Sequence, residues 1–267
     1  MAEAIVGLLH PGEMGAAVGA QLRVRGLPVL WASAGRSEAT SQRALEAGFE
    51  DVGTPDEVAR RSTVILSICP PHAAVDTVRS VAGFSGLFVD ANAIAPATVR
   101  TVADVVDGQC VDGGIIGAPP RRGRVTHLYL SGPNAESVAE LFAGTNVVAR
   151  VLSDDVGAAS ALKLAYAAWT KGTAALLLAI QDFAQREHVE DPLVAEWRES
   201  LPQLADEARR ARRSADAKGW RWVGEMEEIA AAFAAQDLPD GFHRAAAELF
   251  RNVSDPSPRA WQPGVPS

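Results

Sequence analysis

The residues best suited to bind a phosphate group lie near the N-terminus. Residues 4–9 are apolar and indicate a buried strand, and residues 16–25 have the pattern of a helix. The turn between them holds Gly12 and Gly15, spaced like the last two glycines of the G-x-G-x-x-G fingerprint. There, one glycine lets a diphosphate approach the backbone, the other lets helix and strand pack closely, and the helix N-terminus attracts the anion. The pattern predicts a dinucleotide-binding turn made of His10, Pro11, Gly12, Glu13, Met14 and Gly15.

The stretch after the second expected strand bears on the choice between NAD and NADP. An enzyme that uses NAD usually has Asp or Glu here to hold the ribose 2′-hydroxyl. Residues 30–37 contain no carboxylate and offer Ser33, Arg36 and Ser37 instead. Two hydroxyls and a guanidinium suit a 2′-phosphate, which favours NADP. The alternative is that Arg36 is an ordinary solvated loop residue.

A candidate proton donor lies further along the chain. Reduction of a C=O or C=N bond needs a hydride and a proton donor within hydrogen-bond reach of the oxygen or nitrogen. On the long helix expected over 156–186, Lys163, Tyr166 and Thr170 share one face. We expect burial to lower the pKa of Lys163, which would make it a better donor near neutrality. The alternatives are a lysine that reaches solvent at the helix start, and Tyr166 as the donor or as a core residue.

Two further features of the helical region admit more than one interpretation. Trp222 begins an apolar stripe at helical spacing, which suits a core or dimer interface better than a substrate cage. Glu225 lies beside this stripe and is a candidate to pair with a lysine. Lys171, at the edge of the Lys163 face, is a candidate to pair with an acid of the C-terminal region.

The elements that position these residues follow from hydrophobic patterning. Up to about residue 150, short apolar runs alternate with helical patterns that begin at capping signals such as Thr54-Pro55 and Ala95-Pro96. This predicts an α/β fold: a Rossmann domain over 1–153 with a parallel sheet covered on both faces. An all-helical domain is expected over 154–253, joined by the long interdomain helix, with breaks at Pro202, Lys218-Gly219 and Leu238-Pro239. Residues 254–267 are expected to form a loose tail.

Composition excludes several classes of function. The formal net charge is −8 and neither half of the chain is basic, which argues against nucleic acid as a partner. No apolar run reaches the roughly 18 residues of a membrane span. The two cysteines lie in apolar, strand-like stretches and are expected to be reduced thiols. We therefore expect a cytoplasmic protein that binds an anionic cofactor locally, and no metal.

The motifs resemble those of the 6-phosphogluconate dehydrogenase and β-hydroxyacid dehydrogenase superfamily. The run Gly7-Leu8-Leu9-His10-Pro11-Gly12-Glu13-Met14-Gly15 is similar to its phosphate turn, and the later landmarks follow in the same order. Residues 67–71 and 90–96 resemble two loops along the cofactor, so the resemblance implies that Cys69, Pro70 and Asn92 bind it. Residues 111–117 resemble the substrate-binding loop, which includes Gly114 and Ile116. Residues 157–163 resemble the start of the helix with the catalytic lysine, and residues 220–243 a small C-terminal domain of unknown function.

Two departures from the family pattern affect the substrate. Ile116 stands where the family has a serine that binds the substrate, and Ala167 stands where the helix usually carries an asparagine. Of that polar trio only Lys163 remains. A simple 3-hydroxyacid held in the usual way is therefore not expected.

Together these features predict an NADPH-dependent oxidoreductase. It would transfer a hydride to or from a small carbonyl or hydroxy compound, with Lys163 as proton donor and Tyr166 as the alternative donor. Gly114, Ile116, Thr170 and Trp222 would lie near the substrate. An imine reductase on the same scaffold and a cofactor-binding protein without turnover are the alternatives. Because the long helix is apolar nearly all round, we expect it to be buried in a homodimer with interlocked C-terminal domains.

Overall fold

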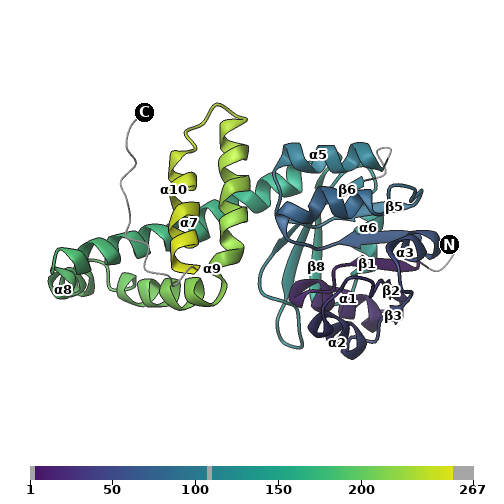
Figure 1. The fold of residues 1–267 in the computed structure, drawn as a ribbon, viewed down its shortest axis with the longest axis horizontal. Helices are drawn as coiled ribbons and strands as arrows, with labels where there is room; N and C mark the ends of the chain where they lie inside the picture. The colour runs from purple at the N-terminus through teal and green to yellow at the C-terminus, as the bar shows by residue number, and fades with distance from the viewer. Residues whose placement is uncertain (1–3, 107–109, 255–267) are drawn as a thin grey trace. The chain divides into compact units, whose positions relative to one another are not determined.

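The computed structural model describes residues 4–106 and 110–254, which divide into two compact units at residues 165 and 166. The first unit contains an eight-stranded sheet in the order β3-β2-β1-β4-β5-β6-β7-β8 (Figure 1). Neighbouring strands are parallel except β6 and β7, which are antiparallel. The strands are β1 Val6–Leu9, β2 Val29–Trp31, β3 Glu50–Asp51, β4 Val64–Ser67, β5 Leu87–Asp90, β6 Cys110–Ile116, β7 Thr126–Ser131 and β8 Val147–Ser153.

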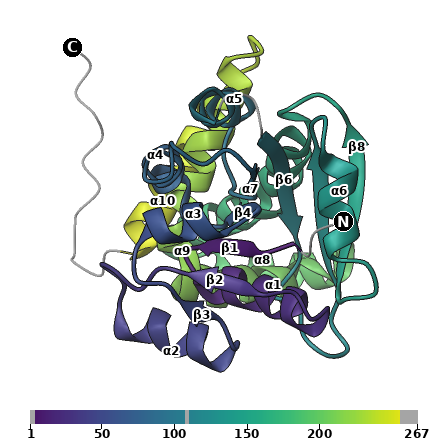
Figure 2. The same cartoon turned by 90° about the vertical axis from the view of Figure 1, so that its right-hand side faces the viewer.

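Helices cover both faces of this sheet, as expected for strands that are buried on both sides. Helices α1 and α6 lie on one face of the sheet and α3, α4 and α5 on the other (Figure 2). One apolar cluster lies beneath each of these two groups. The helices of this unit are α1 Glu13–Val24, α2 Glu38–Glu46, α3 Pro55–Arg61, α4 Ala74–Arg79, α5 Pro96–Val105 and α6 Ala135–Leu141, with a 3₁₀ turn at Pro71–Ala73.

The local signals in the sequence explain where two of these helices begin. Thr54 accepts a hydrogen bond from the amide of Glu57 and Pro55 is the first helical residue of α3, as predicted. Pro96 likewise opens α5. The predicted α/β class is confirmed, but the sequence did not indicate β3 or the antiparallel pairing of β6 with β7.

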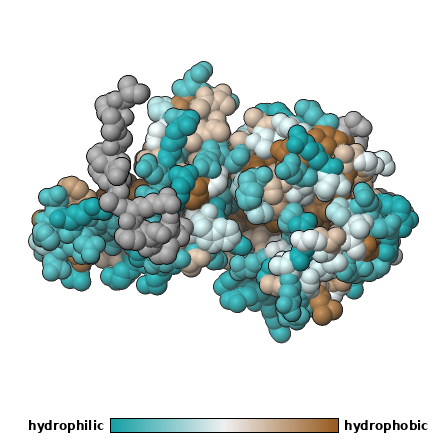
Figure 3. All heavy atoms as spheres, viewed as in Figure 1, coloured by the Kyte–Doolittle hydropathy of each residue, from teal (hydrophilic) through white to brown (hydrophobic). Residues whose placement is uncertain are grey.

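The long helix α7 spans Ala158–Arg186 and passes from the first unit into the second. The second unit continues with α8 Glu190–Ser200, α9 Leu204–Ala234 and α10 Gly241–Ser254. In the space-filling view, hydrophilic residues dominate the visible surface of α8 (Figure 3). Within the described ranges, no helix combines the length and apolar character needed to cross a membrane.

The predicted helix break at Lys218-Gly219 is wrong, because α9 continues through it. Gly219 lies on the buried face of α9, in a stripe that includes Ala211, Ala215 and Met226. Packing of this face offsets the roughly 1 kcal/mol that a glycine costs inside a helix. The predicted breaks near Pro202 and Leu238-Pro239 do fall between helices. Of the predicted tail, only Ser254, the last residue of α10, lies within the described residues.

Candidate cofactor and catalytic site

The turn between β1 and α1 has the shape that a diphosphate requires. Gly12 is the N-cap of α1, and this residue has no side chain with which to cap the helix. A Cβ atom added at Gly12 would meet no atom within 4 Å, so the backbone is open to a ligand there. A Cβ atom at Gly15 would lie 2.5 Å from the carbonyl oxygen of His10, so this position requires glycine for close packing. The two glycine positions thus have the geometry that the fingerprint requires.

His10 replaces the first glycine of the fingerprint and adopts a left-handed backbone conformation, with φ 65°. Its Nδ1 atom is buried and has no hydrogen-bond partner among the described residues. Burial, and secondarily the charge of Arg36, lower the pKa of His10 to about 4. The imidazole is therefore neutral near pH 7.

Arg36 comes from the loop after β2, and its charge acts on both His10 and Cys69. Its Nε atom is buried without a hydrogen-bond partner in the described part of the chain, and burial lowers the pKa of the guanidinium. An unsatisfied buried donor costs about 1–3 kcal/mol, which an anionic ligand would relieve. The structure thus brings a predicted ligand of the 2′-phosphate into the electrostatic environment of the phosphate turn.

The two serines of this loop have partners within the protein. The hydroxyl of Ser37 accepts a hydrogen bond from the amide of Thr40 at 3.3 Å and caps α2. The amide of Ser33 donates to Oδ1 of Asp51 at 3.2 Å, and the amide of Gly53 donates to the same oxygen at 2.9 Å. Sequence reasoning missed Asp51, because it comes from β3 and reaches the end of β2 only through sheet pairing.

Asn92 organises the loops after β4 and β5. Its Oδ1 atom accepts a hydrogen bond from the amide of Cys69 at 2.5 Å, and its Nδ2 atom donates to Asp90 at 2.7 Å and to Ser67 at 3.3 Å. Burial raises the pKa of the fully buried Asp90 to about 7. The side chain of Asn92 thus holds the Cys69-Pro70 loop in place from within the protein. Both cysteines are free thiols, and burial raises the pKa of Cys69 to about 11.

Residues 111–117 do not form the loop that the resemblance implied, because residues 111–116 belong to strand β6. Gly114 packs under α7: a Cβ atom there would lie 2.6 Å from the carbonyl oxygen of Ala159 and 3.1 Å from Cβ of Lys163. Lys163 is half-buried, and Ile116 is half-buried at the end of the strand. The structure therefore places the candidate proton donor directly over β6.

The remaining predicted site residues lie in the second unit. Tyr166 is half exposed, and the hydroxyl of Thr170 donates to the carbonyl oxygen of Tyr166 at 3.2 Å. Trp222 packs edge-on against Phe250, with ring centroids 5.0 Å apart. Its contact is therefore with the apolar core of this unit, the interpretation that the sequence favoured.

Lys171 and Glu225 form an ion pair between α7 and α9. Their side chains are only 12% and 17% exposed. The sequence named each residue as a candidate for an ion pair, and the structure joins them.

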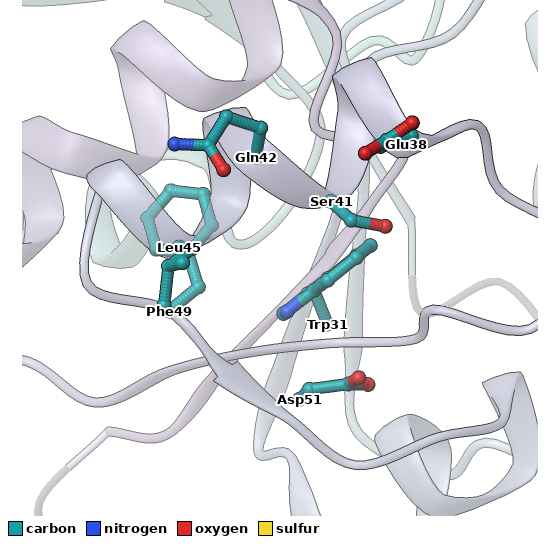
Figure 4. Close-up of a pocket in the computed structure, with 7 residues that line it drawn as sticks. All are labelled: Trp31, Glu38, Ser41, Gln42, Leu45, Phe49 and Asp51. Atoms are coloured by element: carbon teal, nitrogen blue, oxygen red, sulfur yellow. The ribbon is translucent and has the colours of Figure 1, made fainter.

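A surface hollow of about 270 Å³ lies between α2 and the β2–β3 edge of the sheet. Trp31, Leu45 and Phe49 form its apolar wall, and Glu38 and Asp51 also line it (Figure 4). None of the predicted cofactor or catalytic residues lines this hollow, although Asp51 also bonds to the amide of Ser33. Within the described residues, no group of three or more His, Cys, Asp or Glu side chains is arranged to hold a metal ion.

The C-terminal region of the chain matches a known protein family. Residues 184–253 match a family described as a domain of unknown function, DUF1932. An uncharacterised 28.5 kDa protein of Methanothermus fervidus is 28% identical over 162 residues, which are 60% of this chain and 63% of that protein. The match thus spans less than two thirds of the relative's length.

Solved structures match nearly the whole chain. The conserved protein MTH1747, of unknown function and described as similar to 3-hydroxyacid dehydrogenases, is 27% identical with a TM-score of 0.70; the match covers 93% of this chain and 96% of that one. The chain therefore shares the fold of the β-hydroxyacid dehydrogenase superfamily.

Two further structures share this superfamily fold at lower identity. The 3-hydroxyisobutyrate dehydrogenase of Mycobacterium tuberculosis is 15% identical with a TM-score of 0.70, over 94% of both chains. A reductive aminase of Aspergillus terreus, solved with NADPH and ethyl levulinate, is 19% identical with a TM-score of 0.59, over 94% of this chain and 93% of that one.

Proposed function

We propose that this protein is an NADP-dependent oxidoreductase that transfers a hydride to or from a small carbonyl or hydroxy compound. The observation that carries the proposal is the phosphate turn, where an open backbone at Gly12 lies at the N-terminus of α1 and the N-cap residue has no side chain. The buried, unpartnered nitrogens of His10 and Arg36 support it. Anion-binding geometry and unsatisfied buried polar atoms in one region favour a ligand-binding turn over a purely structural one.

The residues present fit a dinucleotide. The backbone from Gly12 to Gly15 and the N-terminus of α1 would hold the diphosphate, and Arg36 would pair with the 2′-phosphate of NADP. The loop that Asn92 fixes, including Cys69 and Pro70, would line the cofactor. When bound, the nicotinamide supplies or accepts the hydride.

Lys163 is the proposed proton donor. As the substrate carbon gains the hydride, the ammonium of Lys163 gives a proton to the substrate oxygen, which leaves an alcohol and a neutral amine that is reprotonated from solvent. Tyr166, one turn further along α7, is the competing donor. Lys163 packs against β6 through Gly114, whereas Tyr166 is half exposed, so the packing supports Lys163.

The residues expected around the substrate are less polar than in hydroxyacid dehydrogenases. Ile116 and Ala167 replace two polar residues of the family pattern, which favours a substrate without a carboxylate held at those positions. Imine reduction is the second candidate function, and the shared fold with a reductive aminase makes it worth testing. A sensor that binds the cofactor without turnover is the third.

We also propose that two copies of the chain associate through α7. Leu162, Tyr166, Trp169, Leu176 and Phe183 follow one another at intervals of three, four and seven residues and are exposed on one side of this helix. Trp169 is 74% exposed and Phe183 64%. A row of large exposed apolar side chains marks an interaction surface, and a second copy, packed with interlocked C-terminal domains, would cover it.

The test combines activity with a matched pair of glycine variants. The purified protein should oxidise NADPH with at least one member of panels of ketones, keto acids and cyclic imines, and the reactive panel decides between the candidate functions.

Gly12→Ala adds a methyl group to open space, so it should leave the melting temperature unchanged but weaken NADPH binding at least about tenfold. Gly15→Ala should lower the melting temperature because its Cβ atom meets the backbone. Unaltered NADPH affinity in a stable Gly12→Ala variant would contradict the proposed cofactor site.

A further inference from the structure

Asp112 is a buried aspartate of β6 whose hydrogen-bond partners lie mainly at the start of α7. It is the third residue of β6 and is 0% exposed. Its Oδ2 atom accepts hydrogen bonds from the amide of Gly157 at 3.0 Å, the amide of Ser160 at 2.9 Å and the hydroxyl of Ser131 at 3.1 Å. Its Oδ1 atom accepts from the hydroxyl of Ser160 at 2.6 Å. Two orphan N–H groups at the start of α7 are thus bonded to a carboxylate from the sheet.

This arrangement differs from an ordinary helix cap. A capping side chain usually belongs to the residue next to the helix and satisfies the first N–H groups locally. Here the cap comes from a residue 45 positions before Gly157. Charge-assisted hydrogen bonds to a helix N-terminus are among the stronger ones, so they tie the start of α7 to β6.

The two residues after Asp112 allow a close approach on both sides. A Cβ atom at Gly113 would lie 3.0 Å from the carbonyl oxygen of Asp90, at the end of β5. At Gly114, a Cβ atom would lie 2.6 Å from the carbonyl oxygen of Ala159 on α7. The carboxylate of Asp112 therefore binds the start of α7, and the glycine at position 114 lets this helix lie against the backbone of β6.

We infer that Asp112 is a positioning residue that fixes Lys163 relative to the loop after β5, an inference that rests on the proposed role of Lys163. Ser160, the residue bonded to both oxygens of Asp112, lies one helical turn before Lys163. Asp112 is also the Cα partner of Asp90, which holds Asn92. Asp112 thus sets the distance between the proposed proton donor and the loop that lines the cofactor.

The test uses the small number of lysines. The chain has only Lys163, Lys171 and Lys218, so reductive methylation with carbon-13 labels gives three side-chain NMR signals besides the N-terminal amine. Lys163→Arg identifies the Lys163 signal. In Asp112→Asn and in Ser160→Ala, we expect this signal to move while those of Lys171 and Lys218 stay in place. Ser160→Ala removes only the hydroxyl that donates to Asp112, so it tests the positioning of Lys163 even if Asp112→Asn does not fold.

Val138→Ala is the matched control, because Val138 is buried on α6 in the same unit and its truncation should lower stability without removing any of these hydrogen bonds of Asp112. A Lys163 signal that is unchanged in both test variants, or that moves equally in Val138→Ala, overturns the inference.

Kinetics separate the inference from the proposed function. Asp112→Asn should lower kcat at least about tenfold, because small displacements of a catalytic group are costly, with the NADPH dissociation constant within about twofold of wild type. Equal kcat values in wild type and Asp112→Asn would overturn the inference. If the wild-type protein reduces no substrate but the Lys163 signal still moves in the variants, Asp112 positions Lys163 and the proposed function is wrong.

Discussion

The two compact units of the chain bury different kinds of side chain. In the first unit, Ser67, Asp90 and Asn92 are buried at the ends of β4 and β5 and are joined by hydrogen bonds, and Asp112 is buried within β6 and bonds to Ser131 and the start of α7. The buried faces of the second unit consist largely of alanine, leucine and a few aromatic residues. Among the described residues of this unit, His243 is the buried polar side chain, and it packs against Phe233 at 4.3 Å between ring centroids.

We interpret this difference as a division of roles, in which the first unit holds the residues proposed for binding and turnover and the second holds the surface proposed for association. Buried polar networks are kept where a loop or a charged group must be held in one place, and in this molecule they hold the loops after β4 and β5 and the start of α7. The second unit instead leaves large apolar side chains of α7 exposed. We therefore expect substitutions in the first unit to affect binding and turnover, and substitutions on the outer face of the second unit to affect association.

The largest expected effect is on turnover. Lys163→Ala should bind NADPH normally and remain associated, but lose roughly 10²–10⁴-fold in kcat, because a general acid contributes about that much. Lys163→Arg should fail as well, since a guanidinium hardly gives up its proton. Steady-state kinetics and fluorescence titration with NADPH measure both quantities. Near-normal turnover in Lys163→Ala, together with its loss in Tyr166→Phe, would assign the acid to Tyr166.

Within the second unit, the largest expected effect is on stability. Lys171→Met leaves Glu225 largely buried without its partner, which should lower the free energy of unfolding by about 3–5 kcal/mol. The double variant Lys171→Met, Glu225→Leu should recover most of this loss. The exposed pair of Arg60 and Glu57 is the control, where Arg60→Ala should cost less than about 1 kcal/mol. Urea unfolding gives these values, and a double variant no more stable than Lys171→Met would refute the explanation.

Substitutions in the exposed apolar row of α7 test most directly whether the second unit mediates self-association. Trp169→Glu places a charge in the exposed apolar row and should weaken self-association at least about a hundredfold by the cost of burying that charge. Val24→Glu is the matched control, since Val24 on α1 is also 74% exposed. Sedimentation analysis should show a dimer for wild type and Val24→Glu and a monomer for Trp169→Glu. A monomeric wild type at micromolar concentration would reject the interface.

A smaller effect is expected on cofactor choice. Arg36→Ala should weaken NADPH binding by about 1.5–3 kcal/mol, the usual strength of a charge-assisted hydrogen bond. Binding of NADH, which lacks the 2′-phosphate, should change little. Equal affinities of the wild type for NADH and NADPH, or equal losses for both in the variant, would show that Arg36 does not read the 2′-phosphate.

The smallest effect is a pH dependence of stability. Because the pKa of His10 is about 4 in the folded chain, against an ordinary value of 6.5, the unfolded chain takes up the proton first on acidification. The contribution of His10 to the free energy of unfolding is therefore fully present above pH 6.5 and is lost as the pH falls towards 4. Relative to His10→Asn, which tolerates the left-handed backbone and does not titrate, wild type should lose on the order of 1–2 kcal/mol over this range, allowing for solvent screening. Parallel stability curves for the two proteins would contradict this.

Much of the fold could be predicted because its signals are local. The turn at Gly12 and Gly15, the cap at Thr54 and the unbroken apolar pattern of α7 depend on residues that are close together in the chain. The break predicted at Lys218-Gly219 failed because a local propensity was outweighed by packing of the same helix face.

The sequence by itself determined the glycine turn between β1 and α1, the α/β class and the candidate residues Arg36 and Lys163, because residue type and spacing carry that information. Only the tertiary structure decided what Asp51 and Asp112 bond to, since one lies 18 residues from Ser33 and the other 48 from Ser160. It also decided that residues 111–116 are a strand and that one side of α7 is exposed. The physical reason is that hydrogen bonds between distant residues, and the coverage of an apolar face, depend on which elements pack together, and no local pattern records that.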